Sequence, residues 1–366
     1  MKKYAYNEIT LTQYIFLIHG AQLGIGVLQL PRILAEKAGM DGWIIIIFGW
    51  IASIVASLII IQIMKKYPEG TLIDLFTKYF GKWAGKAIAL FIALYFAYSA
   101  FLIFQRSILF IQIWILPGVT GYVLMILFAI PTYTIARSGI RIIGRYAELV
   151  FFLVLWMPFF YWFALWGNHH WIHLLPLFKD MKKVLLATQS TAYSFFGFEI
   201  VFLLYPFLQN KEKASVGIII ANSLSMLVFL FITLACFVFF SPDEITLFNE
   251  PTLSILKVVE FRFLERMEII FLAFYLLVLS RAWMPYIYGA VFCTSWLFGK
   301  HDHSKHLLLL LLLMVMIIYF VIPTFNQNDL LQSLSANIAF PFIYIIPLFL
   351  WIYLSIHDRI RGRVTK

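Results

Sequence analysis

Charge is scarce in this chain. Asp, Glu, Lys and Arg make up 13% of its 366 residues, and 63% of the residues are hydrophobic. A soluble domain carries about 25% charged residues, so the composition excludes a soluble domain and predicts a polytopic membrane protein. The two cysteines, Cys236 and Cys293, lie inside apolar runs. We therefore expect neither a disulfide framework nor a metal site.

The common signatures of catalysis are also missing. The sequence has no Gly-x-x-x-x-Gly-Lys-Ser/Thr loop, no Gly-x-Ser-x-Gly elbow and no His-Glu-x-x-His pair. The net charge of +10 comes from basic residues scattered in short loops between apolar runs. That pattern is typical of membrane topology signals and not of a nucleic-acid footprint. We expect no enzymatic activity, no cofactor and no nucleic-acid partner.

Ten apolar runs are long enough to cross a bilayer, which takes roughly 20 helical residues. They lie at 10–37, 41–64, 86–113, 118–136, 143–166, 184–208, 214–240, 267–298, 306–323 and 335–356. With the N-terminus inside, 18 of the 28 Lys and Arg residues fall on the cytoplasmic side and 8 on the outer side, and Arg106 and Arg281 remain within the runs. Because basic residues favour the cytoplasmic side, we expect ten membrane helices with both termini cytoplasmic.

The first and sixth runs are interrupted. Gly24 and Gly26, followed by Pro31, weaken the first helix because glycine adds backbone entropy and proline removes a donor. Gly197 interrupts the sixth run between two phenylalanines. The runs form two sets of five, about 10–166 and 184–356, each with a broken helix first. Since five helices reverse the orientation of the next set, we predict one all-α domain over residues 1–366 with a 5+5 inverted repeat.

Unwound backbone at membrane depth is tolerated where it is buried or lines a cavity. Amides freed near Gly24 and Gly26 lie at the positive end of the outer half-helix and suit a carboxylate. Carbonyls and amides around Phe196, Gly197 and Phe198 suit an ammonium group or a hydroxyl. Together the two breaks predict a site for a small zwitterion such as an amino acid. The alternative is that these glycines only allow close helix packing.

Four ionisable residues lie at membrane depth, where a charge is costly and usually pairs or faces a cavity. Glu199 follows the second break, and we expect it to pair with Arg106 in the third run or with Arg281 in the eighth. Such a pair would serve either the ligand or the stability of the bundle. His19 precedes the first break. It is either a group that titrates near physiological pH or a hydrogen-bonded core residue.

Five strings of residues carry a resemblance to a known family. They are ITLTQ at 9–13, GIGVLQLP at 24–31, AGMDGWI at 38–44, EPT at 250–252 and FLERME at 263–268. With them, essentially the whole chain resembles the B subunits of GerA-type spore germination receptors, a permease-like branch of the amino acid–polyamine–organocation superfamily. The glycine-rich break is shared with many transporters, whereas the AGxDGW, PT and ERxE elements are particular to this family.

The resemblance implies the leucine-transporter fold with broken helices 1 and 6, a location in the inner membrane of the spore, and assembly with A and C subunits. It implies that a small nutrient, commonly an amino acid, binds the backbone around Gly24, Gly26 and Val27 and around 196–198. The fifth run lacks the lysine that replaces a coupling cation in some proton-coupled permeases, and we hypothesise that Arg281 takes this electrostatic role. Besides a nutrient sensor, two alternatives stay open: a proton-coupled amino acid transporter and a structural scaffold subunit.

Overall fold

The structure is a computed structural model that describes residues 7–176, 178–179, 181–259, 266–300, 302–321 and 323–364. Residues 263–265 of the FLERME string lie outside this part. The described residues are mostly helical, which confirms the all-α prediction, and Ile9 and Leu208 form an isolated β-bridge. The helices are α1 (Leu11–Gln22), α2 (Gly26–Ala38), α3 (Gly42–Lys65), α4 (Leu72–Phe80), α5 (Lys82–Phe110), α6 (Gly121–Ala136), α7 (Ile140–Val154), α8 (Met157–Leu165), α9 (Met181–Ser194), α10 (Val201–Leu204), α11 (Ala214–Phe239), α12 (Pro251–Ser254), α13 (Met267–Leu297), α14 (Ser304–Phe320), α15 (Phe325–Phe340) and α16 (Ile346–Val364).

Each apolar run expected from the sequence coincides with one helix or with consecutive helical segments. Within the described residues, six helical stretches have the length and apolar composition to cross a membrane: Gly26–Lys65, Lys82–Ile115, Ile140–Leu165, Lys211–Phe239, Met267–Leu297 and Phe325–Ile360. The shorter apolar helices are Gly121–Ala136, Phe198–Phe207 and Ser304–Phe320. Helices of this length and composition are those of an integral membrane protein.

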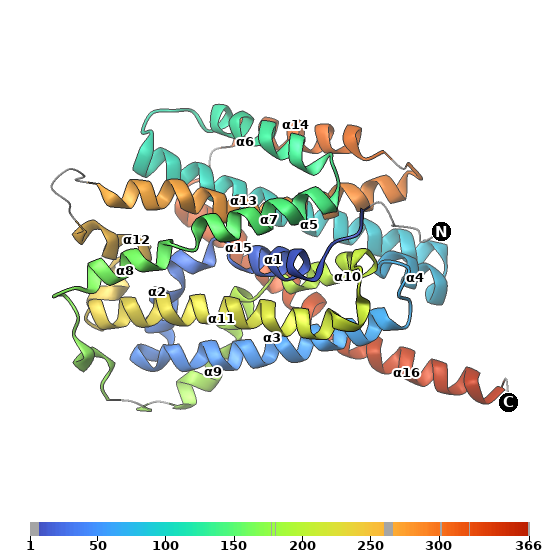
Figure 1. Ribbon diagram of the computed structural model, residues 1–366, viewed down its shortest axis with the longest axis horizontal. Helices are drawn as coiled ribbons and strands as arrows, with labels where there is room; N and C mark the ends of the chain where they lie inside the picture. The colour runs from blue at the N-terminus through green and yellow to red at the C-terminus, as the bar shows by residue number, and fades with distance from the viewer. Residues whose placement is uncertain are drawn as a thin grey trace.

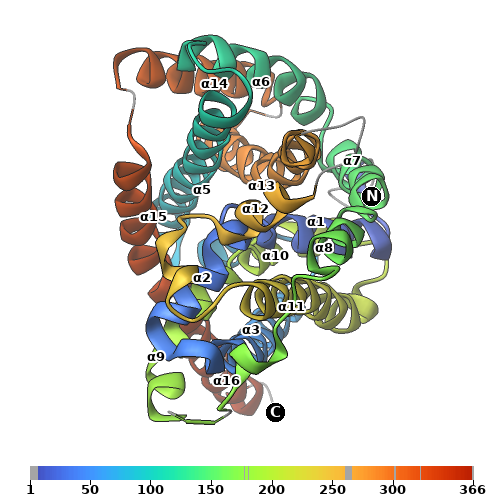
Figure 2. The ribbon, with the colours of Figure 1, turned by 90° about the vertical axis from the view of Figure 1, so that its left-hand side faces the viewer.

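Both halves of the first broken helix, and α10 of the second, occupy the centre of the molecule. Figure 2 shows α1, α2 and α10 in the middle, with α5 and α13 on one side, α3, α9 and α16 on another, and α6 paired with α14 at the periphery. Every residue from Gln13 to Gln22 of α1 is buried. A helix that is buried all round packs against neighbours on every side, and α1 contacts α7, α11 and α13.

The first break lies where the glycines predict it. α1 ends at Gln22 and α2 begins at Gly26. Side chains of neighbouring helices satisfy backbone carbonyls at the break and at the start of α2. The hydroxyl of Tyr275 on α13 donates to the carbonyl of Gly24 at 2.8 Å, and the hydroxyl of Thr252 on α12 donates to that of Val27 at 3.2 Å. Such partners are what unwound backbone needs at membrane depth.

The second break packs directly against the first. Gly197 has a φ of +126°, and a Cβ built on it would lie 2.7 Å from the carbonyl carbon of Ala21 and 2.7 Å from the amide nitrogen of Gln22. Only glycine combines this backbone conformation with so close an approach. The side-chain amide of Gln22 also donates to the carbonyl of Phe195 at 3.0 Å. The two breaks therefore form one contact region in the middle of the bundle.

Candidate ligand site at the two helix breaks

A cavity of about 530 Å³, called here the central cavity, lies between the breaks. Its size falls within the roughly 300–1,000 Å³ of small-molecule pockets. It extends from the breaks to the charged end of α2, so it opens at the end of the molecule where α12 lies, on the left in Figure 1. The lining residues used below are Gln22, Gly24, Ile25, Gly26, Arg32, Tyr95, Ser194, Phe196, Tyr286 and Asp329.

Three of the six predicted ligand residues line this cavity: Gly24, Gly26 and Phe196. A Cβ added at Gly26 would meet no atom within 4 Å, so this glycine leaves open space beside the break. Val27 lines a different cavity, because one residue along a helix turns the side chain by about 100°. Gly197 packs against Ala21 and Gln22, and Phe198 is buried; neither residue is among those that line the cavity. A direct role for the six in ligand binding stays a prediction.

Within the described part of the chain, Glu199 has hydrogen-bond partners and no ion-pair partner. Its Oε1 accepts from the hydroxyls of Tyr95 at 2.8 Å and Tyr286 at 2.9 Å, and its Oε2 accepts from the amide of Gly197 at 2.6 Å. The expected ion pair with Arg106 or Arg281 is therefore wrong. Three donors satisfy the buried carboxyl group without a counter-charge. Because both tyrosines line the central cavity, they separate Glu199 from it.

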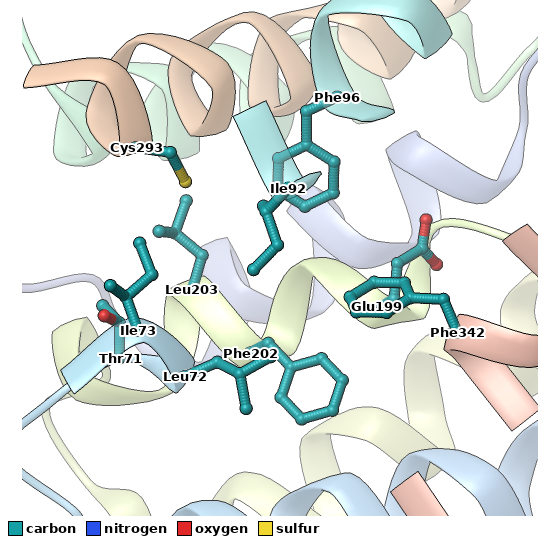
Figure 3. A pocket seen from close by; sticks show the side chains of 10 residues that line it. All are labelled: Thr71, Leu72, Ile73, Ile92, Phe96, Glu199, Phe202, Leu203, Cys293 and Phe342. Carbon is teal, nitrogen blue, oxygen red and sulfur yellow. The ribbon is translucent and has the colours of Figure 1, made fainter. Parts of the chain in front are cut away.

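The central cavity does not continue beyond Glu199. A void of only about 10 Å³ lies there, roughly the space of one water. Figure 3 shows its walls: Ile92 and Phe96 come from α5, Leu203 from α10, and Phe342 from the segment that joins α15 to α16. The central cavity thus opens toward the α12 end, and packed apolar side chains block the opposite direction.

Arg106 joins four parts of the chain at the mouth of the central cavity. Its guanidinium pairs with Glu250 at 3.0 Å and with Asp329 on α15 at 2.8 Å, and Asp329 also accepts from Gln29 on α2 at 3.2 Å. The guanidinium carbon lies 4.3 Å from the ring centroid of Phe325, a cation–π contact. Arg106 itself is fully buried, so these ionic contacts hold α2, α5, α15 and the segment before α12 together.

Glu250 should make stability depend on pH. Burial raises its pKa from the ordinary 4.5 to about 7, against the opposing effect of Arg106. A carboxyl group with a raised folded-state pKa stabilises the fold below its unfolded-state pKa, and this contribution is lost as the pH rises through the folded-state value. We expect the unfolding temperature to fall between about pH 4.5 and 7 and this slope to flatten in Glu250→Gln. Thermal unfolding of both proteins across this range measures it, and parallel profiles would contradict the assignment.

A buried polar network behind the first break was missed by the sequence reasoning. His19 shares a hydrogen bond of 2.9 Å with Ser225, which donates to Gln22 at 2.7 Å. Gln22 donates to Asn222 at 2.7 Å, and Asn222 donates to Ser57 at 3.2 Å. His19 is thus a hydrogen-bonded core residue. The available signal was the pair of polar residues three apart in each of α1 and α11, since such pairs share one helix face.

Solved structures of transporters share this arrangement of helices. MhsT, solved in complex with L-phenylalanine, superposes with a TM-score of 0.70 at 14% identity, over 93% of this chain and 88% of MhsT. A Na⁺-coupled sialic acid symporter superposes with a TM-score of 0.67 at 12% identity, over 94% of this chain and 81% of the symporter. These likenesses show the fold: the chain has the leucine-transporter fold that these solved structures share.

The family follows from the sequence itself. The family described as spore germination protein matches residues 8–330, and the chain belongs to this family. The spore germination protein GerQB of Bacillus cereus is 25% identical over 365 residues, which cover 97% of this chain and 98% of GerQB. The resemblance stated from the five strings is confirmed.

Proposed function

We propose that this protein is the nutrient-sensing B subunit of a spore germination receptor and that it binds an amino acid in the central cavity, without catalytic chemistry. The observation that carries the proposal is that the two helix breaks contact each other and line one cavity. Ile25 makes no side-chain cap at the start of α2, so the first amides of this helix suit the ligand carboxylate. MhsT, with the same fold, was solved with an amino acid bound.

The proposal includes a membrane arrangement. The ten helical regions span the spore inner membrane as an inverted repeat of about 10–166 and 184–356, with both termini cytoplasmic. The bias of basic residues supports this orientation. In Figure 1, α4 and the end of α16 lie at one end of the molecule and α8 and α12 at the other. The A and C subunits are the partners that receive the signal.

Sensing requires two conformations that bind the nutrient with different affinity. In the present structure the central cavity is open on the α12 side, and the apolar residues of Figure 3 close the other side. A ligand that contacts both breaks draws α2, α9 and α15 together around itself. The free energy of those added contacts shifts the population toward the conformation in which these helices enclose the ligand. The partner subunits bind this conformation differently from the open one.

Gly26 provides the sharpest test. A leucine side chain at this position enters the open space of the central cavity, so Gly26→Leu should abolish ligand binding and leave the ligand-free protein folded. A ligand at about 100 times its Kd stabilises a protein by about 2.7 kcal/mol. We expect an amino acid screen by thermal unfolding to find a stabilising compound for the wild type, a weaker effect for Gly26→Ala and none for Gly26→Leu. Undiminished stabilisation of Gly26→Leu would refute the site.

A proton-coupled amino acid transporter is the second candidate. The fold neighbours include a symporter, and a buried carboxyl group, Glu199, lies directly behind the cavity wall. In this alternative Arg281, whose side chain packs against Gly20 of α1, takes the place of a coupling cation. Uptake of the stabilising amino acid into proteoliposomes under a proton gradient would establish transport. Binding without uptake supports the sensor, and no binding at all supports a scaffold subunit.

A further inference from the structure

A second cavity of about 280 Å³, called here the lateral cavity, lies among α1, α7, α8, α11 and α13. None of its lining residues lines the central cavity. Leu23 and Val27 separate the two, because they lie on the face of the first break that points away from Gly24 and Gly26. The first break is therefore flanked by a cavity on each side.

The mouth of the lateral cavity lies on the apolar outer surface of the bundle. Leu155, Leu227 and Phe231 line the cavity and are 53%, 56% and 41% exposed. Leu155 lies between α7 and α8, and Leu227 and Phe231 lie on α11, which contacts α8. Large exposed apolar side chains in the middle of membrane helices face the acyl chains of the bilayer. The cavity is thus open sideways toward lipid.

The inner end of the lateral cavity holds an unpaired cation. Arg281 lines the cavity and is 1% exposed, and none of its three guanidinium nitrogens has a hydrogen-bond partner among the described residues. The ring of Phe151 lies 5.9 Å from its guanidinium carbon. His19, also in the lining, is bonded to Ser225. Because arginine keeps its charge at neutral pH and a buried unpaired charge is costly, this end of the cavity favours an anion.

We propose that the lateral cavity binds a single-chain carboxylate amphiphile from the bilayer. Its carboxylate pairs with the guanidinium of Arg281, which matches carboxylate geometry with two parallel hydrogen bonds, and its chain runs between apolar walls to the mouth. The volume of about 280 Å³ lies just below the usual range of small-molecule pockets. It suits one medium-length chain and not the two chains of a phospholipid.

The amphiphile would contact the first break on the side opposite the central cavity. Tyr275 lines the lateral cavity, and its hydroxyl donates to the carbonyl of Gly24 at 2.8 Å. An amphiphile packed against Tyr275, Leu23 and Val27 holds the break in its present geometry. The lateral cavity is thereby a site through which the lipid environment biases the conformation of the central cavity.

Photolabelling of the full-length protein in lipid nanodiscs tests the proposal. The probe is decanoate with a photoreactive diazirine in its chain, and the labelled residues are located by mass spectrometry. We expect labels on α8, α11 or α13 and about tenfold better competition by decanoate than by 1-decanol or decylamine, since hydrogen bonds to charged groups are strong. Equal competition by decanol, or labels confined to residues that do not line the lateral cavity, would overturn the proposal. Better competition by phosphatidic acid would overturn the single-chain occupant.

Two variants on one helix face give a matched comparison. Leu227→Trp fills the mouth and should abolish specific labelling. Ile220→Trp changes an exposed apolar residue of α11, 40% exposed and two turns away, that does not line the cavity, and it should label like the wild type. Equal labelling of both variants would overturn the site.

The charge is tested separately. Arg281→Gln should remove the preference for decanoate over decanol and keep labelling by the chain. Should this variant fail to fold, the comparison of Leu227→Trp with Ile220→Trp still tests the site. If the amino acid that stabilises the protein also competed with the decanoate probe, the lateral cavity would be part of the nutrient site. That result would overturn the proposal of a second ligand.

Discussion

Replacing Gly197 with alanine is expected to destabilise the protein by about 3 kcal/mol or more. The φ of +126° is strained for any side chain, and the new Cβ would lie 2.7 Å from two backbone atoms of Ala21 and Gln22. Backbone strain of this kind costs about 1–3 kcal/mol, and overpacking costs a similar amount. Because main-chain atoms cannot rotate away, the second break must move off α1. Thermal unfolding of the purified protein and its size-exclusion profile measure the loss.

Gly26→Ala is the matched control for Gly197→Ala. Gly26 also lies at a helix break, but a Cβ there meets no atom within 4 Å. We expect its stability to stay within about 1 kcal/mol of the wild type, since alanine also lowers the entropy of the unfolded chain. Equal losses in the two variants would show that the contact between the breaks is not what makes Gly197 necessary.

Arg106→Gln is the second large effect, with an expected loss of about 3–5 kcal/mol. The substitution leaves Glu250, only 6% exposed, without its cation, whereas Asp329 is 45% exposed and is solvated by water. Removing one partner of a buried ion pair is costly because the remaining carboxyl group must either stay charged and desolvated or take up a proton. Chemical or thermal unfolding of the purified protein measures this difference.

Two further variants isolate the buried charge at Arg106. Arg32→Gln removes an arginine whose pair with Glu36, at 2.7 Å, is partly exposed, so its cost should stay below about 1 kcal/mol. The double variant Arg106→Gln/Glu250→Gln leaves no unpaired carboxylate at position 250 and should recover part of the stability lost in Arg106→Gln. A double variant that is less stable than Arg106→Gln alone would exclude this explanation.

The class of protein and the places where its helices break could be predicted from local sequence. Long apolar runs form helices because a helix satisfies the backbone hydrogen bonds within one continuous segment, as a membrane requires. Glycines within those runs weaken the helix where they stand, as α1 and α2 show around Gly24. Both features depend on a few consecutive residues. They require no knowledge of which helices are neighbours.

The partners within the site depend on contacts between distant helices, and only the tertiary structure decided them. Glu199 bonds to Tyr95, 104 residues away, and not to an arginine, because the packing of α5 against the second break places a hydroxyl there. Val27 lies one residue from Gly26 and yet lines the lateral cavity, since the rotation of α2 sets its direction. Sequence alone therefore determined a membrane protein with two broken helices. The packing of those helices determined that the breaks meet, and which side chains surround them.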